Sequence, residues 1–287
     1  MRRLQNGVGA RVRVVLSGSS DRPHHTRADP FDGLAGPGSA MWVVHGDVAT
    51  IVGGLRALLV QSLHPLAVAG VVDYSDYRQD PLGRLHRTAA FLGDVVFGSV
   101  NDANRAIDAV KKMHQKVNGV APDGRSYAAS DPHLLSWVHC TLIESFWQSR
   151  VRYGTSPLPP GSADRYVAEM AGVGHLLGVE DPPTSAAELT SRLTSFMPEL
   201  EVNHQARDIL RFLLWPKLPF VARVPYTILL GAAIGMLPEF VCQMLGVRFS
   251  RNVDLILVYP SAKILLRMMR WALGPHPEIS AADSEFQ

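Results

Sequence analysis

The sequence predicts a single all-α domain. Apolar residues recur at helical spacing almost throughout the chain, alternating β patterns are scarce, and helix-start residues precede several of the apolar runs. With 287 residues, of which 47% are hydrophobic, the chain can bury a large core. We expect a flexible basic arm over residues 1–30, one all-helical domain over residues 31–272 and a disordered tail over residues 273–287.

Composition excludes several classes of protein. The net charge of +2 and the scattered lysines and arginines give no nucleic-acid footprint. Cys140 and Cys242 form no disulfide framework or CxxC site, so a cytoplasmic location is expected. No apolar run follows Arg2-Arg3, which disfavours a signal peptide. Glycine-rich nucleotide loops and a GxSxG elbow are also absent.

The first predicted helix is a long apolar stretch that follows Ser39 and is closed by Pro65. Gly53 and Gly54 interrupt it, although glycine weakens a helix by about 1 kcal/mol. Two explanations stay open for these glycines. Their backbone could approach a neighbouring helix closely, or it could approach a flat ligand.

Two helices follow, each with a clear start. Asp80-Pro81 opens the first. Ser99 and Asp102 form a capping pair before the second, which ends at Asn118-Gly119. One apolar stripe runs along this second helix, through Ala103, Ile107, Val110, His114 and Val117.

Asp131-Pro132 begins the next helix, whose apolar face includes His139. The intervening loop would let this helix pack antiparallel to the preceding one. Further helices are expected around residues 163–177, after Ser185, and over a proline-broken apolar region from 206 to 273. Within that region, Tyr226–Leu245 is long enough to span a bilayer. Pro238 and Glu239 favour a buried core helix or a surface-associated hairpin instead.

His114 and His139 are the first candidates for chemistry. A histidine on an apolar face is commonly a hydrogen-bonded core residue, but neutral imidazole is also the usual protein ligand of haem iron and transition metals. If both faced one interhelical space, they could hold a cofactor as helical bundles do. A zinc site would need a third ligand, and the carboxylate motifs of di-iron sites are missing.

Arg84 and Thr88 lie four residues apart and share a helix face, with Arg87 one residue off it. An inward guanidinium would suit an anionic group, and Thr88 could donate to a ligand. Solvated arginines at a capped helix start are the alternative. His64 is either a pocket histidine or a helix-terminal residue, and His45 has the same two interpretations. Tyr127 either reaches into a pocket or is an ordinary aromatic residue of a loop. The remaining histidines are interpreted as surface or structural residues: His24, His25, His86, His133, His175, His204 and His276.

These motifs, in this order, resemble the MpaB-type oxygenase family, which is related to latex clearing protein, the rubber oxygenase. The matching strings are HGD, then LLVQSLHPLAVAGVVDYSDYRQDPLGRLHRTAAFLGDVVFG, MHQKVNG, YAASDPHLLSWVHCTL and MPEL. The resemblance covers about residues 31–270. Agreement of several separate motifs makes it more specific than any single histidine.

The resemblance implies a globin-reminiscent helical core with haem b, whose iron is held by a histidine and activates dioxygen. The MH-x-x-V-x-G element places that ligand at His114, with His139 as second choice or pocket base. The distal Arg-x-x-Lys-Thr element corresponds to Arg84, Arg87 and Thr88. Arg87 replaces the lysine, which puts lysine-type capping of the iron in doubt. His64, Tyr127 and Arg84 are further expected pocket residues.

The implied substrate is a lipophilic, isoprenoid-like compound, and the apolar tail would suit peripheral association with a membrane. Two other functions stay open at this stage. One is a non-catalytic haem-binding or lipid-binding helical protein, and the other is a cofactor-free helical interaction protein with core histidines. The oligomeric state is not indicated by the sequence.

Overall fold

The structure is a computed structural model that describes residues 31–75, 77–216, 218 and 220–274, with scattered positions before residue 20. Most of the predicted basic arm lies outside the described residues. The tail beyond Gly274 also lies outside them, so these two predictions stay untested.

The all-α prediction is confirmed. Helices account for nearly all of the regular structure, and strands in the described residues are confined to one antiparallel hairpin, β1–β2, in which Gly119 pairs with Tyr127. The elements in chain order are α2 (Ala40–His45), α3 (Thr50–Gln61), α4 (Pro65–Tyr74), α5 (Pro81–Phe97), α6 (Val100–His114), β1 (Asn118–Val120), β2 (Ser126–Ala128), α7 (Pro132–Tyr153), α8 (Ser162–Leu177), α9 (Ala186–Ser195), η1 (Met197–Glu199), α10 (His204–Leu214), α11 (Phe220–Ile234), α12 (Glu239–Leu245), α13 (Arg251–Val253), η2 (Asp254–Val258) and α14 (Tyr259–Leu273).

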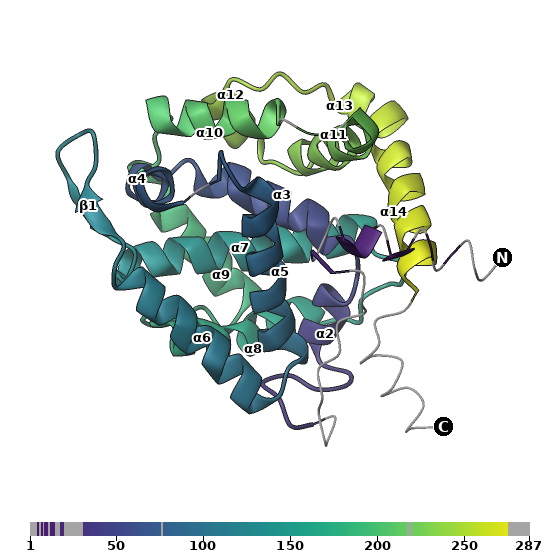
Figure 1. Ribbon diagram of the computed structural model, residues 1–287, viewed down its shortest axis with the longest axis horizontal. Coiled ribbons are helices and arrows are strands. Elements are labelled where there is room, and N and C mark those ends of the chain that lie inside the picture. The colour runs from purple at the N-terminus through teal and green to yellow at the C-terminus, as the bar shows by residue number, and fades with distance from the viewer. Residues whose placement is uncertain are drawn as a thin grey trace.

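The centre of the molecule is the packing of α3 against α7, with α11 on the other side of α3 (Figure 1). A Cβ on Gly53 would lie 2.7 Å from Ser149 Oγ and 3.0 Å from Phe146 Cα, so only glycine fits this crossing. Nothing lies within 4 Å of such an atom on Gly54. Of the two explanations offered for these glycines, close helix contact is therefore correct for Gly53.

The predicted helix starts are confirmed. Ser99 and Asp102 form a reciprocal capping box at α6, and the side chains of Asp80 and Asp131 accept backbone N–H groups at α5 and α7. The long first helix is wrong in one respect, because it is broken at Gly46 into α2 and α3. Asp47 Oδ1 accepts the N–H of Ala49 at 2.8 Å, a local turn that competes with a continuous helix.

The helices that carry His114 and His139 were expected to pack antiparallel to each other, but neither is the main neighbour of the other. Helix α6 packs mainly against α5 and α8, whereas α7 packs against α3, α8 and α9. The short hairpin β1–β2, expected to be a loop, connects α6 to α7 and projects from the body in Figure 1. The two candidate histidines are therefore carried by helices with different main neighbours.

The apolar segment Tyr226–Leu245 is divided between α11 and α12, and much of it is buried, including Leu230, Ala233 and Val241. This agrees with the prediction of core packing rather than a span. Within the described part of the chain, no single helix is long and apolar enough to cross a bilayer, and only the α3–α4 pair, bent by 109°, passes that test jointly.

Candidate functional site

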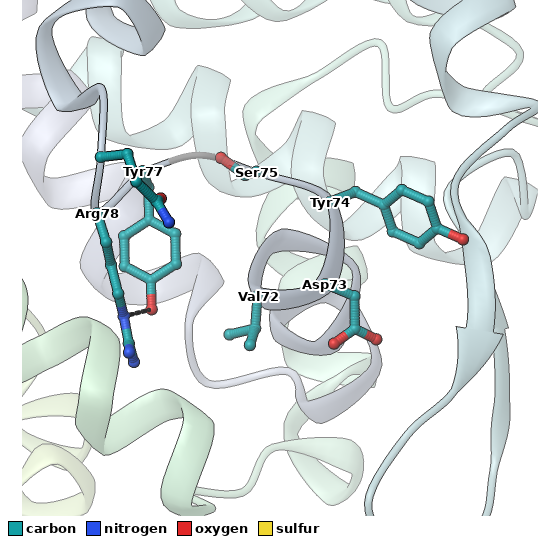
Figure 2. Close-up of a pocket in the computed structure, with 7 residues that line it drawn as sticks. Val72, Asp73, Tyr74, Ser75, Tyr77 and Arg78 are labelled. Carbon is teal, nitrogen blue, oxygen red and sulfur yellow. Dashed lines mark hydrogen bonds between the residues drawn. The ribbon is translucent and has the colours of Figure 1, made fainter.

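A pocket of about 340 Å³ lies where α4 ends and the chain turns toward α5. Its lining combines aromatic and polar side chains, and Figure 2 shows Tyr74 and Tyr77 on opposite sides of it. The residues that line it are Val72, Asp73, Tyr74, Ser75, Tyr77, Arg78 and Gln79. Its volume is at the lower end of the range of small-molecule sites.

Tyr74 connects this pocket to the segment that follows His114. Its hydroxyl donates to the carbonyl of Asn118 at 2.7 Å, and Asn118 begins β1 directly beyond the end of α6. Gly70 supports the same junction, because a Cβ there would be 3.5 Å from both Val117 and Tyr127. The end of α4 and the MHQKVNG segment are therefore neighbours.

Arg84 reaches the pocket wall from α5. Its Nη1 donates to Ser75 Oγ at 3.1 Å, and burial together with the nearby Arg87 lowers its pKa. A half-buried guanidinium at this place can hold an anionic group.

Arg87 and Thr88 face outward and already have partners. Arg87 pairs with Asp80 at 3.3 Å, and the Thr88 hydroxyl donates to the Arg84 carbonyl at 3.0 Å. The i, i+4 relation of Arg84 and Thr88 is as predicted. In this arrangement only Arg84 of the three lies against the pocket wall.

Tyr127 is buried against α4, and its hydroxyl donates to Asp73, a pocket residue. Burial and this hydrogen bond raise the pKa of Tyr127, so its phenol stays protonated. Arg84 and Tyr127, from two different elements, therefore each bond a residue that lines the pocket, Ser75 and Asp73 respectively.

His114 is the last residue of α6 and is half-buried. Its Nδ1 is buried without a hydrogen-bond partner, and burial lowers the pKa of the ring. A neutral imidazole with an unpaired buried nitrogen is chemically suited to a metal or to a hydrogen-bonding ligand.

His139 is buried in α7, and burial lowers its pKa to about 4. Its Nε2 also has no partner. A Cβ on Gly174 of α8 would lie 2.9 Å from that nitrogen, so the glycine backbone covers it. This tight packing leaves His139 little space for iron on Nε2, whereas His114 has no such obstruction among the contacts described.

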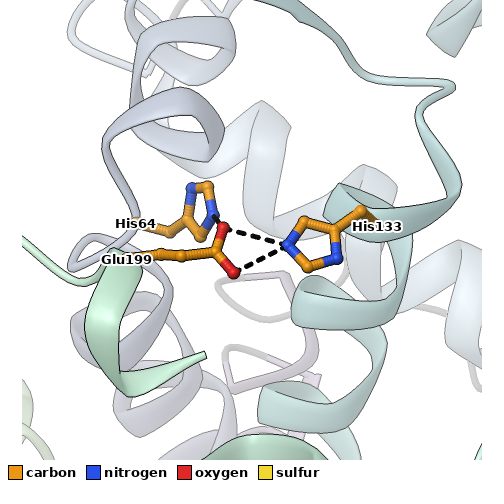
Figure 3. A group of neighbouring side chains, drawn as sticks. All are labelled: His64, His133 and Glu199. Carbon is orange, nitrogen blue, oxygen red and sulfur yellow. Dashed lines mark hydrogen bonds and ion pairs between the residues drawn. The ribbon is translucent and has the colours of Figure 1, made fainter. Parts of the chain in front are cut away.

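His64 lies at the opposite end of α4, about 15 Å from the pocket for a helix of ten residues. It is the N-cap of α4 and meets Glu199 of η1 and His133 of α7, as Figure 3 shows. His64 Nε2 is 3.4 Å from the Glu199 carboxylate, and His133 Nε2 is 2.9 Å from each of its oxygens. Hydrogen bonds from the histidines outweigh burial and lower the pKa of Glu199.

Two histidines and one carboxylate are the ligand types of several metal centres, and these ligand atoms lie within 4.8 Å of one another. Two features oppose a cation here. His64 Nδ1 accepts from Ala67 N at 3.5 Å, which places the ring proton on Nε2, and the cluster sits at the positive N-termini of α4 and α7. The arrangement favours a carboxylate held by two imidazoles.

Sequence reasoning missed this cluster. The sequence places His133 among the surface or structural histidines, and Glu199 enters only as part of MPEL. The two histidines and the glutamate come from segments far apart in the sequence, so no local spacing predicts that they meet. His45, left ambiguous by the sequence, is half-buried and bonds the Tyr166 hydroxyl at 3.1 Å.

Comparison with known proteins places the whole helical body in one family. A family model described as ER-bound oxygenase mpaB/B'/Rubber oxygenase, catalytic domain, matches residues 42–273. No curated protein and no solved structure matches the chain significantly. The match runs from α2 to the end of α14 and includes the pocket, His114 and the His64 cluster. The chain therefore belongs to the mpaB and rubber oxygenase catalytic-domain family, a family of oxygenases.

Proposed function

We propose that this protein is a haem b-dependent oxygenase that uses dioxygen on a lipophilic, isoprenoid-like substrate. Family membership supports the oxygenase class of the reaction. The observation that carries the cofactor proposal is His114, a neutral imidazole with an unpaired buried nitrogen in the MHQKVNG element.

His114 would hold the haem iron, and the bound haem would supply the chemistry of dioxygen activation. The end of a rigid helix is a suitable position for such a ligand, because the imidazole direction is then set by backbone packing. His139 is the second choice for the iron ligand and otherwise a pocket base, though Gly174 covers its Nε2.

Arg84 would bind an anionic group, such as a haem propionate, with the geometry of a guanidinium fork. The protonated Tyr127 phenol would hold Asp73 in place at the pocket wall. Arg87 and Thr88 would need to turn inward to act on a distal ligand, which requires breaking the Arg87–Asp80 pair. Such a surface pair contributes at most about 1 kcal/mol to stability.

We further propose a cytoplasmic protein that associates peripherally with membranes, where a lipophilic substrate would be concentrated. The two thiols, Cys140 and Cys242, are free, which suits a reducing compartment.

The proposal is tested by adding haemin to the purified full chain and recording the Soret band. His114→Ala should abolish the band or shift it to that of free haemin, because the iron loses its protein ligand. His175→Ala, at an exposed position near the end of α8, is the matched control and should leave the band unchanged. Loss of the band in His139→Ala but not in His114→Ala would contradict the ligand assignment, and a chain that takes up no haem would contradict the cofactor.

The second candidate is a non-catalytic haem-binding or lipid-binding protein. The observation favouring it is that Arg87 and Thr88 face outward, leaving Arg84 alone of the distal element at the pocket wall. Oxygen uptake by the haem-loaded protein with an isoprenoid alkene distinguishes the two: uptake with product formation supports the oxygenase, and a stable spectrum without uptake supports the carrier.

A further inference from the structure

The outward face of α14 combines exposed apolar and basic side chains. Ile264, Met268 and Trp271 follow i, i+4, i+7 spacing and are 63%, 61% and 47% exposed. Lys263 and Arg267 are exposed beside them, one residue out of phase. The opposite face of the helix, with Ala262 and Leu266, is buried in the core. Large exposed apolar side chains in such a row are uncommon on a surface that meets only water.

The preceding turn extends this face. Leu255, Ile256 and Leu257 of η2 are all exposed, Ile256 by 79%, and Arg251 and Arg248 lie just before them. Figure 1 places α14 at the edge of the molecule. We call the set Arg251, Ile256, Lys263, Ile264, Arg267, Met268 and Trp271 the α14 ridge.

The charge on the ridge has one sign. Between residues 251 and 274 the only acidic residue is Asp254, which is buried and paired with Arg152. Arg270 is turned inward to Asp47 at 2.6 Å. Among the described residues, no carboxylate lies within ion-pair distance of Arg251, Lys263 or Arg267.

We propose that the α14 ridge binds the surface of a membrane that contains anionic lipids. An interfacial helix of this kind buries its apolar side chains at the level of the headgroups, with tryptophan at the boundary and basic residues on the phosphates. The ridge has all three components on one exposed face. It rests on the peripheral membrane association proposed above, names the surface and the lipid charge that would carry it, and does not depend on the haem.

A second copy of the chain fits this face less well. In a symmetric dimer the same patch meets itself, and a two-fold axis near the middle of α14 would bring Lys263 and Arg267 of one copy against those of the other. Like charges placed together across an interface oppose association, whereas anionic headgroups neutralise them.

The test is co-sedimentation of the full chain with vesicles of phosphatidylcholine alone or mixed with phosphatidylserine. Binding should require phosphatidylserine and weaken with added salt. Lys263→Glu/Arg267→Glu should weaken binding by on the order of tenfold or more, since each basic residue near an anionic surface contributes measurably. Lys111→Glu/Lys112→Glu makes the same charge change on the exposed side of α6 and should leave binding unchanged.

A second measurement locates the contact without depending on those variants. Brominated lipids should quench the tryptophan fluorescence of the bound protein. Trp271→Phe should remove part of this quenching, and Trp215→Phe, at a more exposed tryptophan outside the ridge, should not. The proposal is overturned if phosphatidylserine does not increase binding of the wild type, or if Lys263→Glu/Arg267→Glu and Lys111→Glu/Lys112→Glu bind equally well. It is also overturned if the chain forms a dimer that Ile264→Ser/Met268→Ser dissociates.

Discussion

At the scale of single residues, buried imidazoles are the distinctive chemical feature of this protein. His139 has a pKa of about 4 because its ring is enclosed by α7 and α8, and its Nε2 has no partner to offset that burial. A charged ring in this position would have neither water nor a carboxylate beside it, so it stays neutral.

This gives a pH dependence with a definite sign. The pKa of His139 is about 4 in the folded chain and about 6.5 in the unfolded chain, so only the unfolded chain takes up a proton between these values. Stability should therefore fall as the pH is lowered from about 6.5 to 4, by about 3 kcal/mol from this group. Urea unfolding of wild type and His139→Leu across this range measures it. The variant should lose this part of the pH dependence, and His175→Ala should keep it; identical slopes for all three would disprove the argument.

Single residues were also where sequence reasoning was weakest. The sequence singles out His114 and the Arg84–Thr88 pair because motif and spacing are local properties, and their roles stay predictions. The contact of His64 with Glu199 joins residues 135 positions apart, and no pattern in the chain predicts it. The role of Gly174 in covering His139 is equally a product of helix packing.

At the scale of elements, the close crossing of α3 and α7 depends on one glycine. Gly53 and Gly54 are adjacent and identical in type, but only Gly53 faces α7. Their substitutions should therefore have opposite effects.

Gly53→Ala should destabilise the protein by about 1–3 kcal/mol, because the new methyl group meets Phe146 backbone as well as side-chain atoms. Gly54→Ala meets nothing and should stabilise by up to about 1 kcal/mol through helix propensity. Thermal unfolding of the two variants provides the comparison. Equal shifts in Tm would show that the crossing is looser than described.

Element boundaries were predictable where a side chain acts on its own helix. Ser99, Asp80 and Asp131 each cap a backbone group within three residues, and the sequence shows that relation directly. The break after α2 was missed because the apolar pattern continues through Gly46 and Asp47. The hairpin was missed because its strands are only three residues long.

At the scale of the whole molecule, the C-terminal helices form a layer over α3 and α7 (Figure 1). One apolar cluster unites them, with Leu59 of α3, Leu213 of α10 and Leu266 of α14 among its members. Two ion pairs cross the same junction, Arg152–Asp254 and Arg270–Asp47.

Breaking the first pair on one side should weaken this junction. Arg152→Met leaves Asp254 buried and without its cation, which should cost about 3–5 kcal/mol of unfolding free energy. Arg152→Met/Asp254→Leu should recover much of that loss, because no uncompensated charge then remains. Chemical denaturation of both variants and of Asp254→Leu completes the double-mutant cycle. A double variant as unstable as Arg152→Met would show that the layer depends on the ion pair itself and not on avoiding the burial of one unpaired charge.

The π-helical turn η2 determines which way α14 faces. A π turn accommodates one residue more than an α turn, and such turns are frequent at functional sites. Each residue advances a helix by about 100°, so shortening this turn by one residue would rotate everything after it by that angle. Lys263 and Arg267 would then turn toward the core, on the side that Leu266 occupies now. One added residue in a single turn therefore separates a helix that only completes the fold from one that also presents a ridge to its surroundings.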